Sequence, residues 1–404
     1  MKKNSNQQIH QPDEFAKSNL ISSHEGYESL KFKKLKAILL IAALLSSLTT
    51  VLIGLLVAYL VYYPKRKNEA GVLNGAYLVS DHIGLFVVAM VFSATIVAFT
   101  IFIVLTSKKQ LIIDDNDTTN LAKLTSIGFI ASFTDAIFVG SYVTTMGLNK
   151  AFKTKMVPSK MPGNMTIGYA PAQILESTIF SVVFDVDIVT LVVMMVACII
   201  GGLVGSWVSK YVNNQIFRLF SGISLFIFGI IMILVHPNIA VIAQVAYPTV
   251  KLVGWRLAIG IIAYFILGIF SALGLGIFAP SLAILALLGL EFDAIAVIMS
   301  VGAAAMMPPA AIKFIKDKNY DPKTVILFLT GGLWGCLTCF LVIYLGIQIG
   351  AGIDWDTFKD VLKWIAIVVT FYCSLMMLFD FVKIYGHHGW NEEGSPKSEQ
   401  RNQK

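Results

Sequence analysis

The feature that most constrains this chain is the run from Ala37 to Tyr63, which contains no charged residue. A helix needs about 20 predominantly apolar residues to cross the hydrocarbon core of a bilayer, so this run can span a membrane. It is too long for a cleavable secretory signal. A second run extends from Ile83 to Leu105. Later runs of the same kind cover residues 187–209, 217–235, 324–348 and 359–385, which predicts a chain that crosses the membrane many times.

The composition argues against a soluble fold. Of the 404 residues, 56% are hydrophobic and only 14% are charged, with a mean hydropathy of +0.75, whereas about a quarter of the residues of soluble domains are charged. Inside lipid every backbone amide must be hydrogen-bonded, and few segments show the alternation typical of β-strands. We therefore predict an all-α polytopic membrane protein that is not an enzyme.

Reactive side chains form no pattern of a known chemical site. The net charge is +7, but Lys and Arg lie in short connectors beside apolar runs, which is typical of membrane topology and not of nucleic-acid binding. Cys336 and Cys339 form a C-x-x-C motif without a second pair, and His387-His388 is too little for a metal site. We predict no catalytic residues, no metal, no cofactor and no nucleic-acid partner.

The segments 121–169 and 255–312 are irregular and resemble each other weakly. With a shift of about 136 residues, Val139-Gly140-Ser141-Tyr142 falls on Leu275-Gly276-Ile277-Phe278. Pro171 then falls next to Pro308. This pattern indicates an internal repeat, and the charges of the connectors test it.

The charges of corresponding connectors are opposite. The basic connector at 150–160 corresponds to one with only Glu291 and Asp293, and the acidic residues between 176 and 187 correspond to the lysines between 313 and 323. Lys210 and Arg218 likewise correspond to Asp354, Asp356 and Asp360. Because cytoplasmic loops retain Lys and Arg, systematic inversion predicts two inverted-topology helical repeats.

This topology places both termini in the cytoplasm and breaks two helices. The stretch 121–148 must enter and leave on the cytoplasmic side, and the stretch 256–290 must begin and end outside, so both are expected to be broken, re-entrant helices. Lys65-Arg66-Lys67 fits poorly, because it is placed outside. The predicted segments are a polar cytoplasmic tail (1–36), two N-terminal transmembrane helices (37–120), a first repeat (121–235), an external connector (236–255), a second repeat (256–385) and a cytoplasmic C-terminal tail (386–404).

Broken helices at corresponding places of inverted repeats are typical of secondary transporters, whose sites lie near the bilayer midplane. The free amide groups and the dipole at a helix N-terminus attract an anion, and glycine allows close approach to the backbone. The predicted substrate-binding residues are Asp135, Gly140, Ser141, Thr144, Thr145, Gly163 and Asn164 in the first repeat, and Gly276, Pro280, Ser281, Ser300 and Gly302 in the second.

Asp135 lies inside an apolar stretch, where an ionised acid costs at least about 2.5 kcal/mol. Two interpretations stay open: Asp135 carries a proton or orders nearby hydroxyls during transport, or it caps a helix break. Lys160, beside Pro162-Gly163, either reaches toward an anion or marks the cytoplasmic face. For Glu176 we expect a solvated position near the outer end of its span.

Two stretches of the sequence resemble the sulfite exporter TauE/SafE family of bacterial membrane permeases. The first contains Gly128-Phe129, Asp135, Gly140-Ser141 and Pro162-Gly163-Asn164. The second contains Gly254-Trp255, Leu275-Gly276-Ile277-Phe278-Ala279-Pro280, Leu288-Gly289-Leu290, Ser300-Val301-Gly302 and Met307-Pro308. The resemblance covers residues 121 to 385.

The resemblance implies a two-repeat helical permease in the bacterial cell membrane that moves small sulfur-containing anions, such as sulfite, thiosulfate or an organosulfonate. Together with the residues it predicts a secondary transporter for a small anionic substrate, coupled to protons if Asp135 titrates. The alternatives are transport of another small organic anion, or a transporter-like membrane sensor or scaffold, for which the polar N-terminal tail is the only support.

Overall fold

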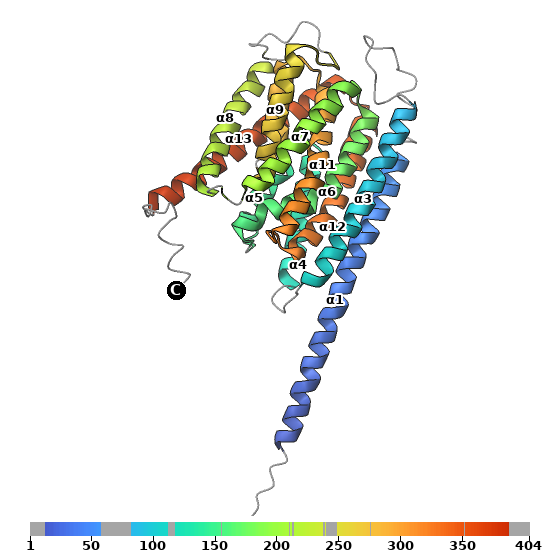
Figure 1. Cartoon of the computed structure of the whole chain (residues 1–404), viewed down its shortest axis with the longest axis vertical. Helices are drawn as coiled ribbons and strands as arrows, with labels where there is room; N and C mark the ends of the chain where they lie inside the picture. The colour runs from blue at the N-terminus through green and yellow to red at the C-terminus, as the bar shows by residue number, and fades with distance from the viewer. Residues whose placement is uncertain are drawn as a thin grey trace, which may run out of the picture.

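The computed structural model describes residues 13–57, 82–111, 118–154, 156–209, 211, 214–236, 239, 249–274, 276–350 and 352–387. Within them the chain forms twelve α-helices, packed side by side in a bundle (Figure 1). The all-helical prediction is therefore confirmed for these residues. The helices are α1 (Asp13–Val57), α3 (His82–Gln110), α4 (Thr118–Asp135), α5 (Ser141–Ala151), α6 (Met161–Val183), α7 (Ile188–Val208), α8 (Asn214–Val235), α9 (Trp255–Ala272), α10 (Phe278–Leu287), α11 (Phe292–Lys316), α12 (Pro322–Cys339) and α13 (Trp355–His387), with the 3-10 helix η3 (Pro158–Lys160) and the π-helix η4 (Phe340–Gly350) between them.

Six helical segments in the described part of the chain are long and apolar enough to cross a membrane. Large hydrophobic side chains also face outward from the bundle, among them Leu52, Trp207 and Val368, which are 62%, 56% and 64% exposed. Such a surface suits a lipid environment. The chain thus has the architecture of a multi-span helical membrane protein. The six segments are Lys33–Val57, Met90–Lys108, Ile188–Val208, Trp255–Ala272, Phe292–Lys316 and Pro322–Gly346.

Two details differ from the sequence-based expectations. Part of the polar tail predicted over residues 1–36 is helical, from Asp13 onward, because a helix already nucleated in the apolar run extends at little cost per added residue. The span expected over 324–348 is α-helical only to Cys339 and continues as η4. Lys65-Arg66-Lys67, the poor fit to the predicted topology, lies outside the described residues.

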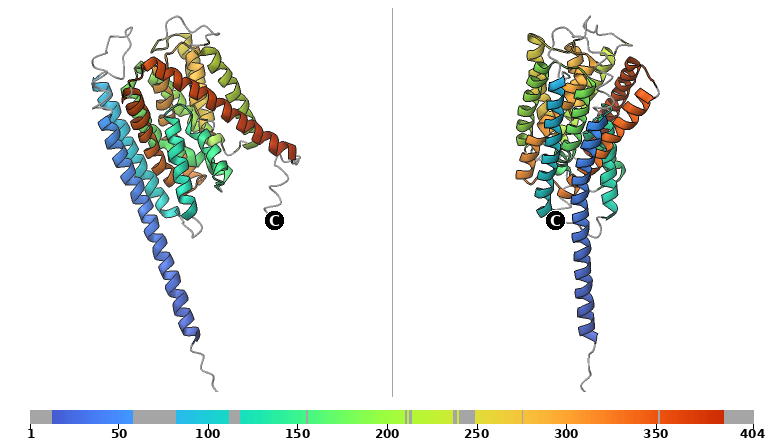
Figure 2. Two further views of the ribbon diagram at one scale, coloured as in Figure 1. Left: turned by 180° about the vertical axis from the view of Figure 1, so that it is seen from behind. Right: turned by 90° about the vertical axis from the view of Figure 1, so that its right-hand side faces the viewer.

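The helices α6 and α11 form the centre of the bundle (Figure 1). Nearly every side chain of α6 from Met161 to Val182 is buried. α6 packs on α12, α11 and α3, and α11 packs on α7 and α6. Figure 2 shows α1 and α3 at one edge of the bundle and the α8–α13 pair at the other edge.

Two helix pairs, α4/α5 and α9/α10, are interrupted by connectors with the same backbone pattern. In each connector two residues, two positions apart, have a left-handed backbone conformation, and corresponding residues are 136 residues apart, the shift found in the sequence. They are Phe138 (φ 67°) and Gly140 (φ 89°) in the first connector, and Gly274 (φ 102°) and Gly276 (φ 74°) in the second.

Glycines allow the first helix of each interrupted pair to lie against a long helix of the other half. A Cβ atom added to Gly201 of α7 would overlap the carbonyl oxygen of Phe265 in α9. A Cβ atom added to Gly335 of α12 would overlap the carbonyl oxygen of Phe129 in α4. Small residues permit such close helix packing in membranes. The packing between the two halves is reciprocal. α4 and α6 of the first half pack on α12 of the second, and α9 and α11 of the second half pack on α7 of the first.

The two interrupted pairs have their outer termini at opposite ends of the bundle: α4 begins and α5 ends at one end, and α9 begins and α10 ends at the other. At one end, Lys123 near the start of α4 donates to the carbonyl oxygen of Phe152 after α5 (3.3 Å), and the start of α6 contacts the α11–α12 turn. At the other end, the chain before α9 pairs with the chain after α10, where Thr249 N donates to Gly289 O (3.1 Å). Asp187 N, at the start of α7, donates to Val250 O (3.1 Å) there. Because α7 and α11 run the length of the bundle, these contacts define its two ends.

Candidate functional site

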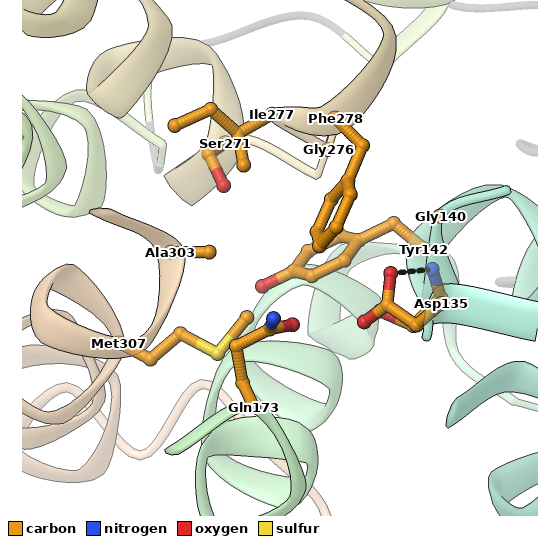
Figure 3. A pocket seen from close by; sticks show the side chains of 11 residues that line it. Asp135, Gly140, Tyr142, Gln173, Ser271, Gly276, Ile277, Phe278, Ala303 and Met307 are labelled. Carbon is orange, nitrogen blue, oxygen red and sulfur yellow. Dashed lines mark hydrogen bonds between the residues drawn. The ribbon is translucent and has the colours of Figure 1, made fainter. Parts of the chain in front are cut away.

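A small cavity lies between the two connectors, in the middle of the bundle (Figure 3). It has room for about one water molecule. The connectors and first turns of α5 and α10 supply most of its wall, and α6 and α11 close it from the other side. The lining residues are Asp135, Gly140, Ser141, Tyr142, Gln173, Ser271, Gly276, Ile277, Phe278, Ala303 and Met307.

Most of these residues are paired by position in the two halves of the chain. Each pair is separated by 136 residues, so both connectors present the same backbone positions to the cavity. The chemistry of the two halves nevertheless differs, since the first half supplies the acidic and phenolic side chains. The pairs are Asp135 with Ser271, Gly140 with Gly276, Ser141 with Ile277, and Tyr142 with Phe278.

Asp135 caps the amino terminus of α5. Its side chain is only 3% exposed, and its Oδ1 atom accepts a hydrogen bond from Ser141 N at 2.7 Å. A carboxylate is favourable at this position because it satisfies a free amide group and meets the positive end of the helix dipole. The structure therefore shows the capping role considered for Asp135. Figure 3 also shows its carboxylate directed at the cavity, and a role in proton transfer stays a prediction.

The predicted residues Thr144 and Thr145 hold α5 in place and do not line the cavity. Thr144 pairs with the hydroxyl of Thr134 in α4 at 2.9 Å, and Thr145 pairs with the hydroxyl of Tyr169 in α6 at 2.6 Å. The hydroxyl of Tyr142, a cavity residue, bonds to Thr166 of α6 at 3.0 Å. A network of hydroxyl groups thus fixes the first connector against its neighbours.

Gly163 and Asn164 lie at the start of α6, away from the cavity. Asn164 Oδ1 accepts a hydrogen bond from Asp321 N at 2.6 Å. A Cβ atom added to Gly163 would overlap the carbonyl oxygen of Asn319. These two residues attach the α11–α12 turn to α6, and they bring no atom to the cavity wall.

Of the predicted residues of the second half, one lines the cavity and the others do not. Gly276 lines the cavity. Pro280 occupies the first turn of α10, where a missing N–H leaves no helical hydrogen bond unmade. Ser281 and Ser300 are fully buried, and the Ser300 hydroxyl donates to Val297 O at 3.2 Å within its own helix. Gly302 accommodates the ring of Tyr264, which would lie 3.1 Å from an added Cβ atom.

The sequence interpretation did not identify Tyr142, Gln173, Ser271 and Met307 as cavity residues. Tyr142 and Ser271 carried a usable signal, because the 136-residue shift places them opposite Phe278 and Asp135. Gln173 and Met307 carried none, since their role depends on how α6 and α11 face each other across the centre.

Glu176 is buried, contrary to the expected solvated position. Its side chain is 1% exposed, and Oε1 accepts a hydrogen bond from Gln173 Nε2 at 3.2 Å. The reason is that α6 occupies the centre of the bundle, so neighbouring helices cover it along its whole length.

One carbonyl group of the first connector, that of Ala136, has its hydrogen-bond partner outside the connector. Tyr344 of η4 donates to Ala136 O at 3.0 Å. The ring of Phe138, whose φ of 67° is unusual for a side chain of this size, packs on Phe180 and Phe292 at centroid distances of 5.5 and 5.1 Å. This packing helps to hold a strained backbone conformation. η4 therefore contributes directly to the site.

The described residues of the cavity wall include one carboxyl group and no Lys, Arg or His side chain. Positive potential comes instead from the amino termini of α5 and α10, each equivalent to about half a unit charge. The described residues contain no group of three or more His, Cys, Asp or Glu side chains that could hold a metal ion. The described cavity thus combines backbone amides, hydroxyls and apolar side chains around a space of about one water molecule.

A scan against models of known protein families, a search of curated proteins and a search of solved structures each found no match.

Proposed function

We propose that this protein is a secondary transporter that moves a small solute through a site between two inverted-topology repeats. The first repeat would run from α4 to α8 and the second from α9 to α13. The observation that carries the proposal is the central cavity, because it is lined by equivalent positions of two helix breaks that open toward opposite ends of the bundle. Such a site is typical of alternating access.

The lengths of the helices support re-entrant segments. α5 and α10 contain 11 and 10 residues, or about 16 and 15 Å of helix. The hydrocarbon core is about 30 Å thick, so each helix reaches about halfway across. The connectors would then lie near the midplane.

The proposed orientation rests on the distribution of lysines. Five lysines lie at the end of the bundle where α4 begins and α5 ends: Lys123, Lys150, Lys153, Lys313 and Lys316. Lys and Arg are retained on the cytoplasmic side of a membrane, so we place this end in the cytoplasm of a bacterial cell. Both termini would then be cytoplasmic.

The proposed substrate is a small anion that contains sulfur. The amino termini of α5 and α10 favour an anion, and the choice of sulfite, thiosulfate or an organosulfonate rests on the family resemblance. Asp135 opposes a bound anion, since two unit charges about 6 Å apart repel by about 3 kcal/mol at an effective dielectric constant of about 20. We therefore propose that the anion moves together with protons.

A zwitterionic sulfonate is the second candidate, because a carboxylate lies in a cavity wall that has no basic side chain. In taurine the sulfonate would meet the helix amino termini and the ammonium group would meet Asp135. The sensor or scaffold alternative gains no observation from the described residues.

The test is uptake of radiolabelled sulfite, thiosulfate, taurine and sulfoacetate into proteoliposomes, with and without a pH gradient. We compare the wild type with Asp135→Asn and with Asp187→Asn. Asp187 is the matched control, because it is a buried capping carboxylate of α7 outside the cavity, where it accepts from Thr190 N at 2.9 Å.

We expect saturable uptake by the wild type and by Asp187→Asn. Asp135→Asn should bind a simple anion about a hundredfold more tightly, and taurine about a hundredfold more weakly, because the charge interaction of about 3 kcal/mol is removed. Absence of flux for all four solutes in sealed vesicles with folded protein would contradict the sulfur assignment. If Asp135→Asn and Asp187→Asn changed uptake equally, the proposal that the solute binds at the cavity would be contradicted.

A further inference from the structure

Gln173 connects the cavity to a second buried carboxyl group. Gln173 lines the cavity, whereas Glu176, one turn further along α6, does not. Both side chains are 1% exposed, and Gln173 Nε2 donates to Glu176 Oε1 at 3.2 Å. The amide is thus oriented by Glu176 and ends in the cavity.

The other end of the Gln173 amide is unpaired. Its Oε1 atom is buried and has no hydrogen-bond partner among the described residues. Figure 3 shows the amide at the cavity, on the side of Asp135. A buried acceptor without a partner costs free energy, so its presence needs a reason. In this state the cavity presents an acceptor, which repels an anion.

The surroundings of Glu176 contain acids and no base. Asp135 interacts with it from the end of α4, and α12 contributes the thiols of Cys336 and Cys339. The π-helix η4 contributes the phenol of Tyr344, whose ring packs on Phe180 of α6 at a centroid distance of 5.9 Å. Residues 37–57 of α1, 83–107 of α3 and 294–312 of α11 contain no Asp, Glu, His, Lys, Arg, Cys or Tyr. A proton is therefore the simplest partner for this carboxyl group.

We propose that Glu176 is a proton-binding site and that Gln173 converts its protonation into anion affinity of the cavity. With Glu176 ionised, the amide donates to it and shows its oxygen to the cavity. With Glu176 protonated, the carboxyl O–H donates to that oxygen instead. The amide then turns over and offers its NH₂ group to the anion. Protonation would thus exchange an acceptor for a donor at the site.

This inference rests on the proposed function and deepens it, because it names the coupling proton site of the transporter. It predicts that proton and anion bind together. For one proton bound with each anion, the apparent affinity changes by up to about tenfold per pH unit. Affinity should be high at low pH and fall as the pH rises through the titration of Glu176.

The first arm of the test needs no transport. Infrared difference spectra of the full-length protein in bilayers, recorded between acidic and basic pH, report the protonation of carboxyl groups. Asp135→Asn should show a protonated carboxyl band that the double variant Asp135→Asn/Glu176→Gln lacks, so that the buried Asp135 does not contribute. Gln173→Met should shift the frequency of that band, because the bond to the amide oxygen is lost. A band that persists in the double variant Asp135→Asn/Glu176→Gln with undiminished intensity would overturn the inference.

The second arm measures exchange of labelled against unlabelled thiosulfate, which does not titrate near neutral pH, in the Asp135→Asn background. Glu176 is then the remaining acid of the proposed site. At subsaturating anion, the exchange rate should fall by up to tenfold for each unit by which the pH is raised. It should be independent of pH once Glu176→Gln is added. Ser177→Ala is the matched control, since its buried hydroxyl donates only to Ile174 O in its own helix. Unchanged pH dependence after Glu176→Gln would overturn the inference. Absence of exchange by every variant, including the wild type, would overturn the proposed function, and the infrared arm then still decides the proton site.

Discussion

The two connectors that meet at the cavity place their backbones alike and their side chains differently. Both have left-handed residues at equivalent positions, and both end in a helix amino terminus at the cavity. The first supplies Asp135, Ser141 and Tyr142, whereas the second supplies Ser271, Ile277 and Phe278 at the same positions. The shared backbone conformation therefore builds the site, and the first half supplies its charge.

The largest expected effect breaks the shared packing. Gly201→Leu and Gly335→Leu should each abolish folded protein, because the added side chain meets the backbone of Phe265 or Phe129, which cannot rotate away. Size-exclusion chromatography of detergent extracts measures the folded yield. Gly147→Leu is the control, since its Cβ atom would meet only Met376 Sδ at 3.9 Å. If only one of these two substitutions lowered the folded yield, the two helix contacts would not be equivalent.

The next effect tests the two connectors at their equivalent glycines. Gly140→Ala and Gly276→Ala should each lower the free energy of unfolding by about 1–2 kcal/mol, the cost of a left-handed backbone for a residue with a Cβ atom. Thermal unfolding in detergent measures this cost. Gly346→Ala, where φ is ordinary and Cβ would lie 3.4 Å from Leu341 O, serves as the control. A cost at one position only would show that the connectors are not equivalent.

A smaller effect separates the two halves. Asp135→Ala should lower the free energy of unfolding by about 1 kcal/mol, since Ser141 N loses its acceptor, while Ser271→Ala should cost less than about 0.5 kcal/mol. Asp135→Asn retains the capping oxygen and should remain close to the wild type. Equal losses for Asp135→Ala and Ser271→Ala would remove the proposed asymmetry.

The smallest effect concerns the phenol that distinguishes Tyr142 from Phe278. Tyr142→Phe makes the first half resemble the second and should cost about 1 kcal/mol or less, because the bond to Thr166 is lost. Tyr372→Phe, on a side chain that is 61% exposed, should leave the unfolding temperature unchanged. A loss of the same size in both variants would mean that the buried bond contributes nothing measurable.

The features that were predictable from the sequence depend on local composition and on spacing. Apolar runs predicted the helices α3, α7, α8 and α13. The 136-residue shift made Gly140 and Gly276 equivalent, and both have a positive φ in the structure. Both signals follow from short stretches of chain. The end of the first apolar run, beyond Val57, lies outside the described residues.

The remaining features depend on packing between distant segments. Glu176 was expected in solvent because a lone acid near the end of a span is usually solvated, yet α12, α11 and α3 enclose α6. The partners of Thr144, Thr145 and Asn164 lie on other elements, so their anchoring roles could not be seen in a linear pattern. The π-helix η4 has no sequence signature of its own, and its contact with Ala136 spans 208 residues of chain.

The central claim is that α4/α5 and α9/α10 enter the membrane from opposite sides. The most direct test attaches a membrane-impermeant maleimide to single added cysteines in vesicles of known orientation. The positions are Lys123 and Lys153, at the open end of the first pair, and Val253 and Leu287, at the open end of the second, all of which are exposed. The cysteines are added to a Cys373→Ser background, which also serves as the control, because the remaining Cys198, Cys336 and Cys339 are buried. We expect Lys123→Cys and Lys153→Cys to react only from the cytoplasmic side, and Val253→Cys and Leu287→Cys only from the outside. Reaction of all four from one side, or of the two ends of one pair from different sides, would contradict the account.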